Sequence, residues 1–284
     1  MAEPVALSAA IGRTPRTEVL FTGAVASRHL RLDLAPVPVI SRAFAPMVRE
    51  GRYAVSEMAI ATFLMAKAAG KDLVLLPVIL AARFQEGALL CQAGSAIAGP
   101  ADLAQRRIGV RAYSQTTGMW LRGILQDGFG LRPEAMRWVT FEDAHLAEYR
   151  DPPCAERAPP GADMLAMLKA GELDAAIFGN ELPADPVLRP VFPDPEAAGA
   201  AFRATHGFVP VNHLLVTRGD VARDRPELMA ELVSLFRAAG AAVPGREGLD
   251  PALALAIRYA HSQGLLPRPL ALDEVWDGLP PGLG

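Results

Sequence analysis

The chain has 284 residues, of which 51% are hydrophobic and 21% are charged, and its formal net charge is −3. This length allows one large domain or two smaller ones. Arg and Lys are scattered without a basic run, so we expect no nucleic-acid partner. The longest apolar runs, residues 58–66 and 73–82, are shorter than the roughly 18 residues of a membrane span, so we expect no membrane partner.

The N-terminal stretch MAEPVALSAAIG carries an acidic residue at position 3 and no cationic start. A signal peptide needs a positively charged start and a continuous apolar segment, whereas residues 5–12 have the pattern of a first strand. We therefore expect a cytoplasmic protein, and a periplasmic one only if a leader has been removed. Cys91 and Cys154 lie far apart without CxxC spacing, which is typical of reduced, structural cysteines.

Strand-like and helix-like segments alternate along the chain, which predicts an α/β fold with largely parallel sheets. One pattern occurs twice, as MVREGRYAVS in residues 47–56 and as MLKAGELDAA in residues 167–176. In both, a helix is expected to end at a glycine, Gly51 or Gly171, before the chain turns into a strand. The repeat indicates two similar lobes, although ten residues can also resemble one another by chance.

Two stretches rich in small residues, Gly or Pro are suited to connecting such lobes: residues 92–103 and residues 183–195. We therefore predict a discontinuous first lobe of residues 1–95 plus 206–284, a second lobe of residues 96–205, and a cleft between them.

Residues 107–110 predict a strand that runs into the polar loop Tyr113–Gly118 and then into an amphipathic helix. Thr116 or Thr117 is expected to cap the start of this helix, because a threonine hydroxyl can accept a hydrogen bond from a backbone N–H there. The same helix end is suited to binding an anion, with Ser114 beside it. A simple cap and an anion site are both compatible with the pattern.

Arg122 is expected on the polar side of this helix. There it forms a salt bridge with a carboxylate or, through its forked donors, pairs with an anionic ligand. Further along, residues 208–220 predict a strand that carries Asn212 and His213, and residues 225–240 predict a helix. On that strand, His213 is either hydrogen-bonded in the core or in contact with a ligand.

The stretch YSQTTGMWLRGIL resembles the Tyr–x–x–Thr–x–x–x–Trp–x–Arg–Gly–Ile–Leu segment of the 4,5-dihydroxyphthalate decarboxylase-like family, and the likeness extends over most of residues 8–225. That family has the type 2 periplasmic-binding-protein fold, and many members are named substrate-binding proteins of ABC transporters. The resemblance implies a two-lobed α/β fold with a ligand in an interdomain cleft. The residues that match the family's motifs are Tyr113, Thr116, Trp120, Arg122, Glu57, Met58 and His213.

The chain departs from the family in two places. Where the family shows an Arg-rich RxFRH stretch, this chain has AARFQEG, in which Arg83 can substitute through a shift of one place. The family's GGxExPGR segment is replaced by VTFEDAHLAEYRDPP. In that replacement, His145 and Glu148 would share one face if the segment is helical. They are weak candidates for a metal site, and a solvated acidic face is the alternative.

We interpret the chain as a protein that closes on a small carboxylated ligand and resembles an enzyme for non-oxidative decarboxylation of a hydroxylated aromatic acid. His213 or Glu57 is the expected catalytic acid, and no cofactor or metal is required. The alternatives are a solute-binding receptor of an ABC-type transporter, which would then be the partner, or a fold relative acting on another small metabolite. The expected ligand-binding residues are Tyr113, Ser114, Thr116, Thr117, Trp120, Arg122, Met58, Arg83 and Asn212.

Overall fold

The computed structural model describes residues 3–179 and 182–283. The chain divides into two compact units, the first of Met1–Ala82, Val211–Ile257 and Leu266–Gly284, and the second of Arg83–Pro210 and Arg258–Leu265. It therefore leaves the first unit after Ala82 and returns at Val211. The two Gly/Pro-rich stretches predicted as connections lie inside the second unit.

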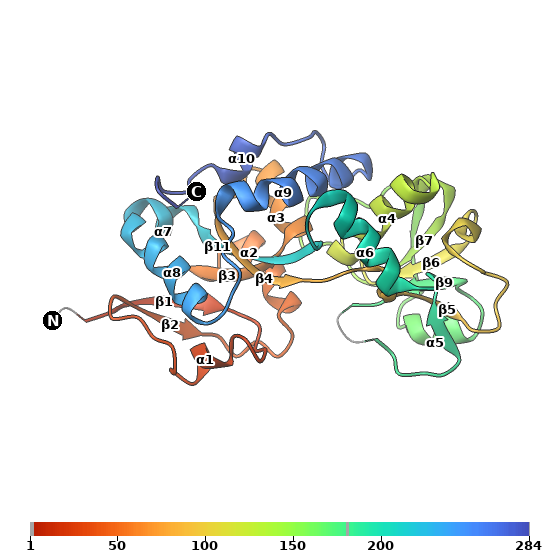
Figure 1. Ribbon diagram of the computed structural model, residues 1–284, viewed down its shortest axis with the longest axis horizontal. Coiled ribbons are helices and arrows are strands. Elements are labelled where there is room, and N and C mark those ends of the chain that lie inside the picture. The colour runs from red at the N-terminus through yellow and green to blue at the C-terminus, as the bar shows by residue number, and fades with distance from the viewer. Residues whose placement is uncertain (1–2, 180–181, 284) are drawn as a thin grey trace. The chain divides into compact units, whose positions relative to one another are not determined.

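The first unit is built on a five-stranded sheet with the strand order β2-β1-β3-β11-β4. Strand β1 pairs in parallel with β2 and β3, whereas β11 runs antiparallel to both β3 and β4. The strands are β1 (Val5–Ala10), β2 (Leu30–Leu34), β3 (Val55–Ala59), β4 (Leu73–Ala82) and β11 (Val211–Arg218). The helices that begin in this unit are α1 (Glu18–Phe21), α2 (Ser41–Glu50), α3 (Ile60–Ala68), α7 (Gly219–Asp224), α8 (Pro226–Ala238), α9 (Gly245–Ser262) and α10 (Leu272–Trp276) (Figure 1).

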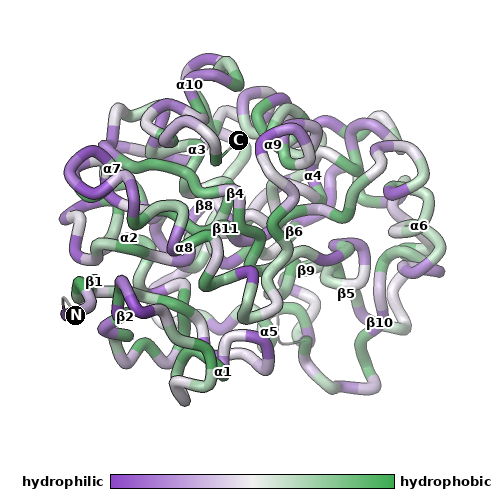
Figure 2. Tube along the Cα trace, turned by 60° about the vertical axis from the view of Figure 1, so that its left-hand side comes forward, coloured by the Kyte–Doolittle hydropathy of each residue, from purple (hydrophilic) through white to green (hydrophobic). Residues whose placement is uncertain are grey.

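Apolar side chains of the strands and of α8 form the core of the first unit. Figure 2 shows the hydrophobic colour along β4 and β11, whose residues are largely buried. Leu228, Leu232 and Phe236 of α8 lie in the same buried cluster as strand residues such as Val55 and Leu76. The helix predicted over residues 225–240 is thus confirmed, because its periodic apolar face is what the sheet needs to exclude water.

The second unit is built on a six-stranded sheet with the order β10-β5-β9-β6-β7-β8. Strands β9, β6, β7 and β8 are parallel neighbours, and β5 is antiparallel to β9 and β10. The strands are β5 (Leu89–Gln92), β6 (Arg107–Val110), β7 (Arg137–Thr140), β8 (Ala155–Arg157), β9 (Ala175–Ile177) and β10 (Leu188–Pro190). The helices are α4 (Thr116–Phe129), α5 (Met164–Lys169) and α6 (Pro195–His206), with 3₁₀ turns η1 (Glu86–Ala88), η2 (Pro100–Leu103) and η3 (Pro133–Ala135).

The repeated helix–glycine–strand pattern is present in both units. Gly51 follows α2 with φ of 60°, and Gly171 follows the end of α5 with φ of 76°. These are left-handed conformations, which glycine adopts without the steric cost of a Cβ atom. After each glycine the chain enters a strand, β3 or β9, as predicted. Each unit is therefore an α/β structure, which confirms the predicted fold class, although both sheets are mixed rather than largely parallel. Across residues 3–179 and 182–283, no helix has the length and apolar character that crossing a membrane requires.

Candidate functional site

In the first unit, the structure brings together the two residues expected to be catalytic. Nδ1 of His213 lies 2.6 Å from Oε1 of Glu57, although the residues are 156 positions apart in sequence. Glu57 is on β3 and His213 on β11, where His213 faces Ala59, so the two side chains are diagonal neighbours on one face of the sheet. We call Glu57 and His213 the acid–base pair.

The second oxygen of Glu57 is held by the backbone. The N–H of Gly12, just after β1, donates a hydrogen bond of 2.8 Å to Oε2 of Glu57. A Cβ atom on residue 12 would lie 3.0 Å from that oxygen, so glycine permits this close approach. The hydroxyl of Thr17 donates to the Gly12 carbonyl at 2.5 Å and fixes the loop. Glu57 is 5% exposed, and both of its oxygens have defined partners.

The imidazole of His213 is held on one side and available on the other. Glu57 engages Nδ1, and the ring of Phe44 meets the imidazole edge-to-face at a centroid distance of 5.4 Å. Among the described residues, none makes a hydrogen bond to Nε2, and the side chain keeps 15% of its surface exposed. A carboxylate that accepts Nδ1–H sets the tautomer and orientation, so Nε2 can exchange a proton with a ligand.

In the second unit, the predicted polar loop leads into the N-terminus of α4. The helix begins at Thr116, and its N-cap is Gln115, which makes no side-chain capping bond. The expectation that Thr116 or Thr117 is the cap is therefore wrong by one or two positions, although both threonines lie in the first turn. This turn follows β6 at the carboxyl edge of the parallel strands, the edge where α/β sheets bind ligands.

Arg83 lies next to this helix end. Its Nη2 donates a hydrogen bond of 3.0 Å to Oγ1 of Thr117. The guanidinium group is largely buried, and burial lowers the pKa of Arg83 from its ordinary value. The first turn of a helix already presents N–H groups with no partner inside the helix and the positive end of the helix dipole. We call Thr116, Thr117 and Arg83 the anion cluster, because together they present donors and positive charge.

Arg122 does not lie on a polar helix face, so that expectation is wrong. Its side chain is fully buried, with the guanidinium carbon 3.9 Å from the centroid of the Tyr113 ring. Nη2 donates to the Tyr113 carbonyl at 2.6 Å, and Nε donates to Oε1 of Gln263 at 2.8 Å. Arginine can be buried in this way because its planar group stacks on aromatic faces.

Trp120 and Tyr113 are also enclosed in the second unit. Trp120 has no exposed surface and meets the rings of Phe202, Phe208 and Tyr259 at centroid distances of 5.8 to 6.3 Å. Tyr113 is 1% exposed, and its ring meets Trp138 edge-to-face. Most of the Tyr–Thr–Trp–Arg signature therefore packs α4 against its neighbours, and its threonine stands at the helix end.

The other expected ligand-binding residues are buried in their own units. Ser114 is 5% exposed in the loop before α4, and Asn212 is 4% exposed beside His213. Met58 is fully buried on β3, where it pairs with Leu214 of β11. The structure thus places Asn212 next to the acid–base pair in sequence and Met58 in the core of the sheet.

The segment that carries the weak metal candidates is not helical. Residues 141–150, which include His145 and Glu148, form bends and turns. The condition for placing the two side chains on one helix face is therefore not met. Within the described part of the chain, no three His, Cys, Asp or Glu side chains gather in a way that could hold a metal ion.

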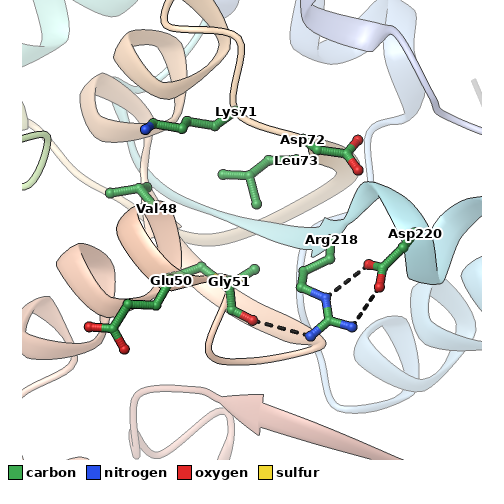
Figure 3. Close-up of a pocket in the computed structure, with 9 residues that line it drawn as sticks. Val48, Glu50, Gly51, Lys71, Asp72, Leu73, Arg218 and Asp220 are labelled. Atoms are coloured by element: carbon green, nitrogen blue, oxygen red, sulfur yellow. Dashed lines mark hydrogen bonds and ion pairs between the residues drawn. The ribbon is translucent and has the colours of Figure 1, made fainter. Parts of the chain in front are cut away.

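A separate pocket in the first unit has a different character. It measures about 550 Å³ and lies at the opposite end of β11 from His213, around Arg218, Asp220 and Gly51 (Figure 3). Arg218 forms two hydrogen bonds with Asp220, at 2.9 and 2.7 Å, and a third with the Gly51 carbonyl. The guanidinium of Arg218 is thus already paired with a carboxylate, and Lys71 is a second cation in the lining of this pocket.

Several residues of these arrangements were not singled out from the sequence, among them Thr17, Phe44, Gly12 and Gln263. Gly12 positions Glu57, and Gln263 is 2% exposed and connects Arg122 to the Met119 carbonyl. Gly12 lies within residues 8–225, over most of which the family resemblance extends, so a signal for it existed. Gln263 lies outside the range of that resemblance, and no local pattern marks it.

Comparison with known proteins finds two relatives of the same name, and no family model matches the chain. The 4,5-dihydroxyphthalate decarboxylase of Comamonas testosteroni is 27% identical over 254 residues, which cover 85% of this chain and 76% of that protein. The protein of that name from Pseudomonas putida is 28% identical over 178 residues, which cover 58% of this chain and 67% of that protein.

Among solved structures, the periplasmic aliphatic sulphonate binding protein of Escherichia coli is similar, with a TM-score of 0.55. The match covers 97% of this chain and 83% of that chain at 15% sequence identity. Such a likeness concerns the fold alone. The chain therefore has the fold of periplasmic binding proteins, as the sequence resemblance implied, and its similarity to 4,5-dihydroxyphthalate decarboxylases is a finding of sequence comparison.

Proposed function

We propose that the protein binds a small aromatic carboxylate and removes a carboxyl group as carbon dioxide without oxidation. The observation that carries this proposal is the acid–base pair, in which Glu57 orients His213 and leaves Nε2 available. Proton transfer to a reacting carbon requires a donor that is held in one orientation, and Glu57 holds His213 in this way.

The reaction follows from the chemistry of the pair. The carbon–carbon bond between the ring and its carboxylate breaks, and the electron pair stays on the ring carbon as carbon dioxide leaves. A proton from Nε2 of His213 forms the new carbon–hydrogen bond, and solvent then returns a proton to the imidazole. Glu57 accepts the hydrogen bond of Nδ1 and stabilises the imidazolium before it gives up its proton.

The anion cluster of the second unit is suited to binding a small anion. Such an anion accepts hydrogen bonds from the first turn of α4 and pairs with Arg83, whose guanidinium is next to Thr117. The relatives named 4,5-dihydroxyphthalate decarboxylase support a hydroxylated aromatic acid as the substrate class.

A solute-binding receptor is the second candidate, and the fold supports it. The similar protein of Escherichia coli is named as a binding protein for aliphatic sulphonates, which are small anions. A receptor would use the anion cluster and have no use for proton transfer by His213.

The decisive experiment compares His213→Asn with the parent protein on 4,5-dihydroxyphthalate and a panel of hydroxylated benzoates. Carbon dioxide release, ligand affinity and melting temperature are measured on each. We expect loss of turnover by about 10²-fold or more with folding retained, because general acid catalysis contributes that much. The exposed His261 provides the matched control, His261→Asn, which should leave turnover unchanged.

Three outcomes distinguish the enzyme, the receptor and a structural role of His213. Lost turnover in a folded variant supports the enzyme. Binding by the parent protein with no carbon dioxide from any compound of the panel supports the receptor. A collapse of folding in His213→Asn, with affinity per folded molecule unchanged, means that the histidine has a structural role.

A further inference from the structure

Arg122 is a charged group enclosed in the second unit with only neutral partners. Its side chain has no exposed surface, and two of its nitrogens donate to the Gln263 side chain and the Tyr113 carbonyl. The third, Nη1, is buried with no hydrogen-bond partner. The guanidinium group lies over the aromatic rings of Tyr113 and Trp138, with its carbon 3.9 and 5.1 Å from the two ring centroids.

No carboxylate of the described residues forms an ion pair with Arg122. Burial lowers the pKa of its guanidinium, but arginine starts far above neutral pH and keeps its proton in proteins. A full positive charge therefore lies inside the unit without a direct ion pair, and the Asp151 carboxylate attracts it only from a longer distance. Burial of a charge disfavours folding unless other interactions compensate it.

The uncompensated nitrogen lies under the start of α4. A Cβ atom built on Gly118, the third residue of that helix, would be 3.1 Å from Nη1 of Arg122 and 3.2 Å from Val110. Glycine at this position therefore leaves room for the guanidinium against the first turn. The cation adds its field to the positive end of the helix dipole.

We propose that Arg122 is a positioning residue that strengthens anion binding at the start of α4 without touching the ligand, so that the site prefers doubly charged to singly charged anions. Its charge acts through the first turn, and its hydrogen bond to Tyr113 holds the loop before that turn. A bound anion adds a second negative charge near Arg122, beside the more distant carboxylate of Asp151. This inference rests on the anion cluster of the proposed function and does not depend on whether a reaction occurs.

Gln263 offers a way to cancel the charge and leave the guanidinium in place. In Gln263→Glu, a carboxylate of nearly the same shape takes the position 2.8 Å from Nε of Arg122 and pairs with it. Gln263→Met is the matched control, because it removes the same amide hydrogen bonds and adds no charge. Affinity is measured by calorimetry for phthalate, benzoate and benzamide, which carry two, one and no negative charges at neutral pH, together with melting temperature.

We expect Gln263→Glu to weaken the binding of phthalate by about tenfold or more and that of benzoate by a smaller factor, and to leave that of benzamide unchanged. The reason is that a Coulomb interaction is proportional to the charge of the ligand, so the loss grows with the number of carboxylates. Gln263→Met should change the three affinities by a common factor. An equal loss for all three ligands in folded Gln263→Glu, or no loss for phthalate, overturns the inference.

The remaining outcomes are also decisive. Should Gln263→Glu not fold, Arg122→Lys and Arg122→Gln replace it: the lysine must keep the preference for phthalate over benzamide, and the glutamine must lose it. A parent protein that binds neither anion overturns the inference together with the anion cluster. A parent protein that binds phthalate and releases no carbon dioxide from the benzoate panel overturns the proposed reaction and leaves the inference standing.

Discussion

Each unit of the molecule contains a buried charged side chain, and the two are compensated in opposite ways. In the first unit, Glu57 accepts hydrogen bonds from the Gly12 backbone and from His213, so both carboxylate oxygens are satisfied. In the second unit, Arg122 has two neutral acceptors, aromatic faces and one nitrogen without a partner. Burial is similar, at 5% and 0% exposure, so compensation is what distinguishes the two charges.

The comparison teaches where each charge can act. The negative charge of Glu57 interacts directly with the imidazole of His213. It therefore affects a ligand only through the proton that His213 carries. The charge of Arg122 has no hydrogen-bonded carboxylate, and Asp151 attracts it only at longer range, so its field extends to the start of α4. The first arrangement is suited to moving a proton and the second to holding an anion.

The largest effect that tests this difference is expected from Glu57→Gln. Glutamine still accepts the Gly12 N–H at Oε, but it gives the imidazole no negative charge to stabilise its protonated form. Turnover should fall about 10²-fold or more, while the free energy of unfolding changes by about 1 kcal/mol or less. Steady-state kinetics and urea unfolding check the two parts separately.

A second measurement shows whether Glu57 acts through His213. Residues that act as one unit give losses that do not add. The double variant with His213→Asn should therefore be no slower than His213→Asn alone. If the losses of turnover in the two single variants add in the double variant, Glu57 has a role that is independent of His213.

The next largest effect is expected from Gly123→Ala, at the position where the helix that carries Arg122 packs against Tyr259. A Cβ atom on Gly123 would lie 2.1 Å from the ring of Tyr259, so Gly123→Ala must displace α4 or that ring. We expect a loss of about 2–3 kcal/mol in the free energy of unfolding, as for overpacked cores. Displacing α4 also admits water to Arg122, which screens its charge, so the preference for phthalate over benzoate should shrink.

The same helix provides the control. No described atom lies within 4 Å of a Cβ built on Gly128, and this glycine has no positive φ. Gly128→Ala should therefore raise stability by about 0.5–1 kcal/mol through helix propensity. Equal effects at the two positions would show that α4 is not closely packed at Gly123.

Local features of the fold could be predicted from the sequence, because they depend on neighbouring residues. The strand over residues 107–110 is β6 as expected, and Pro226 is the first residue of α8. Gly51 and Gly171 take the left-handed conformation that a helix end requires. Each of these signals lies within a few residues of the structure that it forms.

The candidate site depends on contacts between distant residues, which periodicity does not encode. Glu57 and His213 were named from the sequence, but their contact depends on the pairing of β3 with β11. Arg122 was expected at a polar surface because a charged residue on a helix usually faces water. Its burial depends on Gln263, which is 141 positions away, and on two aromatic rings that no local pattern predicts.

The smallest expected effect concerns Glu86, a third buried charge that extends the comparison. Glu86 is 1% exposed; its Oε2 accepts the Gln85 N–H at 2.8 Å, and its Oε1 is buried without a partner. Burial raises the pKa of this carboxyl above its ordinary value. Unlike Arg122, a carboxyl can escape the cost of burial by binding a proton.

The sign of the pH dependence follows from that direction. Between the unfolded pKa, about 4.3, and the raised folded pKa, the folded chain keeps a proton that the unfolded chain has lost, so stability falls as pH rises through this window. Glu86→Gln keeps the acceptor for Gln85 and removes the charge. The variant should be more stable than the parent by about 1 kcal/mol at pH 7 and equal to it at pH 4.

Asp127 provides the opposite sign as a control for Glu86. Hydrogen bonds from Arg258 hold the pKa of Asp127 below its ordinary value, so its stabilising effect is present above the unfolded pKa and is lost as pH falls. Asp127→Asn should therefore lose stability at pH 7 and approach the parent at low pH. Urea unfolding at pH 4 and pH 7 measures both variants. A Glu86→Gln variant that is less stable than the parent at pH 7 would mean that the ionised carboxylate of Glu86 is stabilised by its surroundings, as that of Glu57 is. Arg122 would then be the one of these three buried charges whose burial is not compensated.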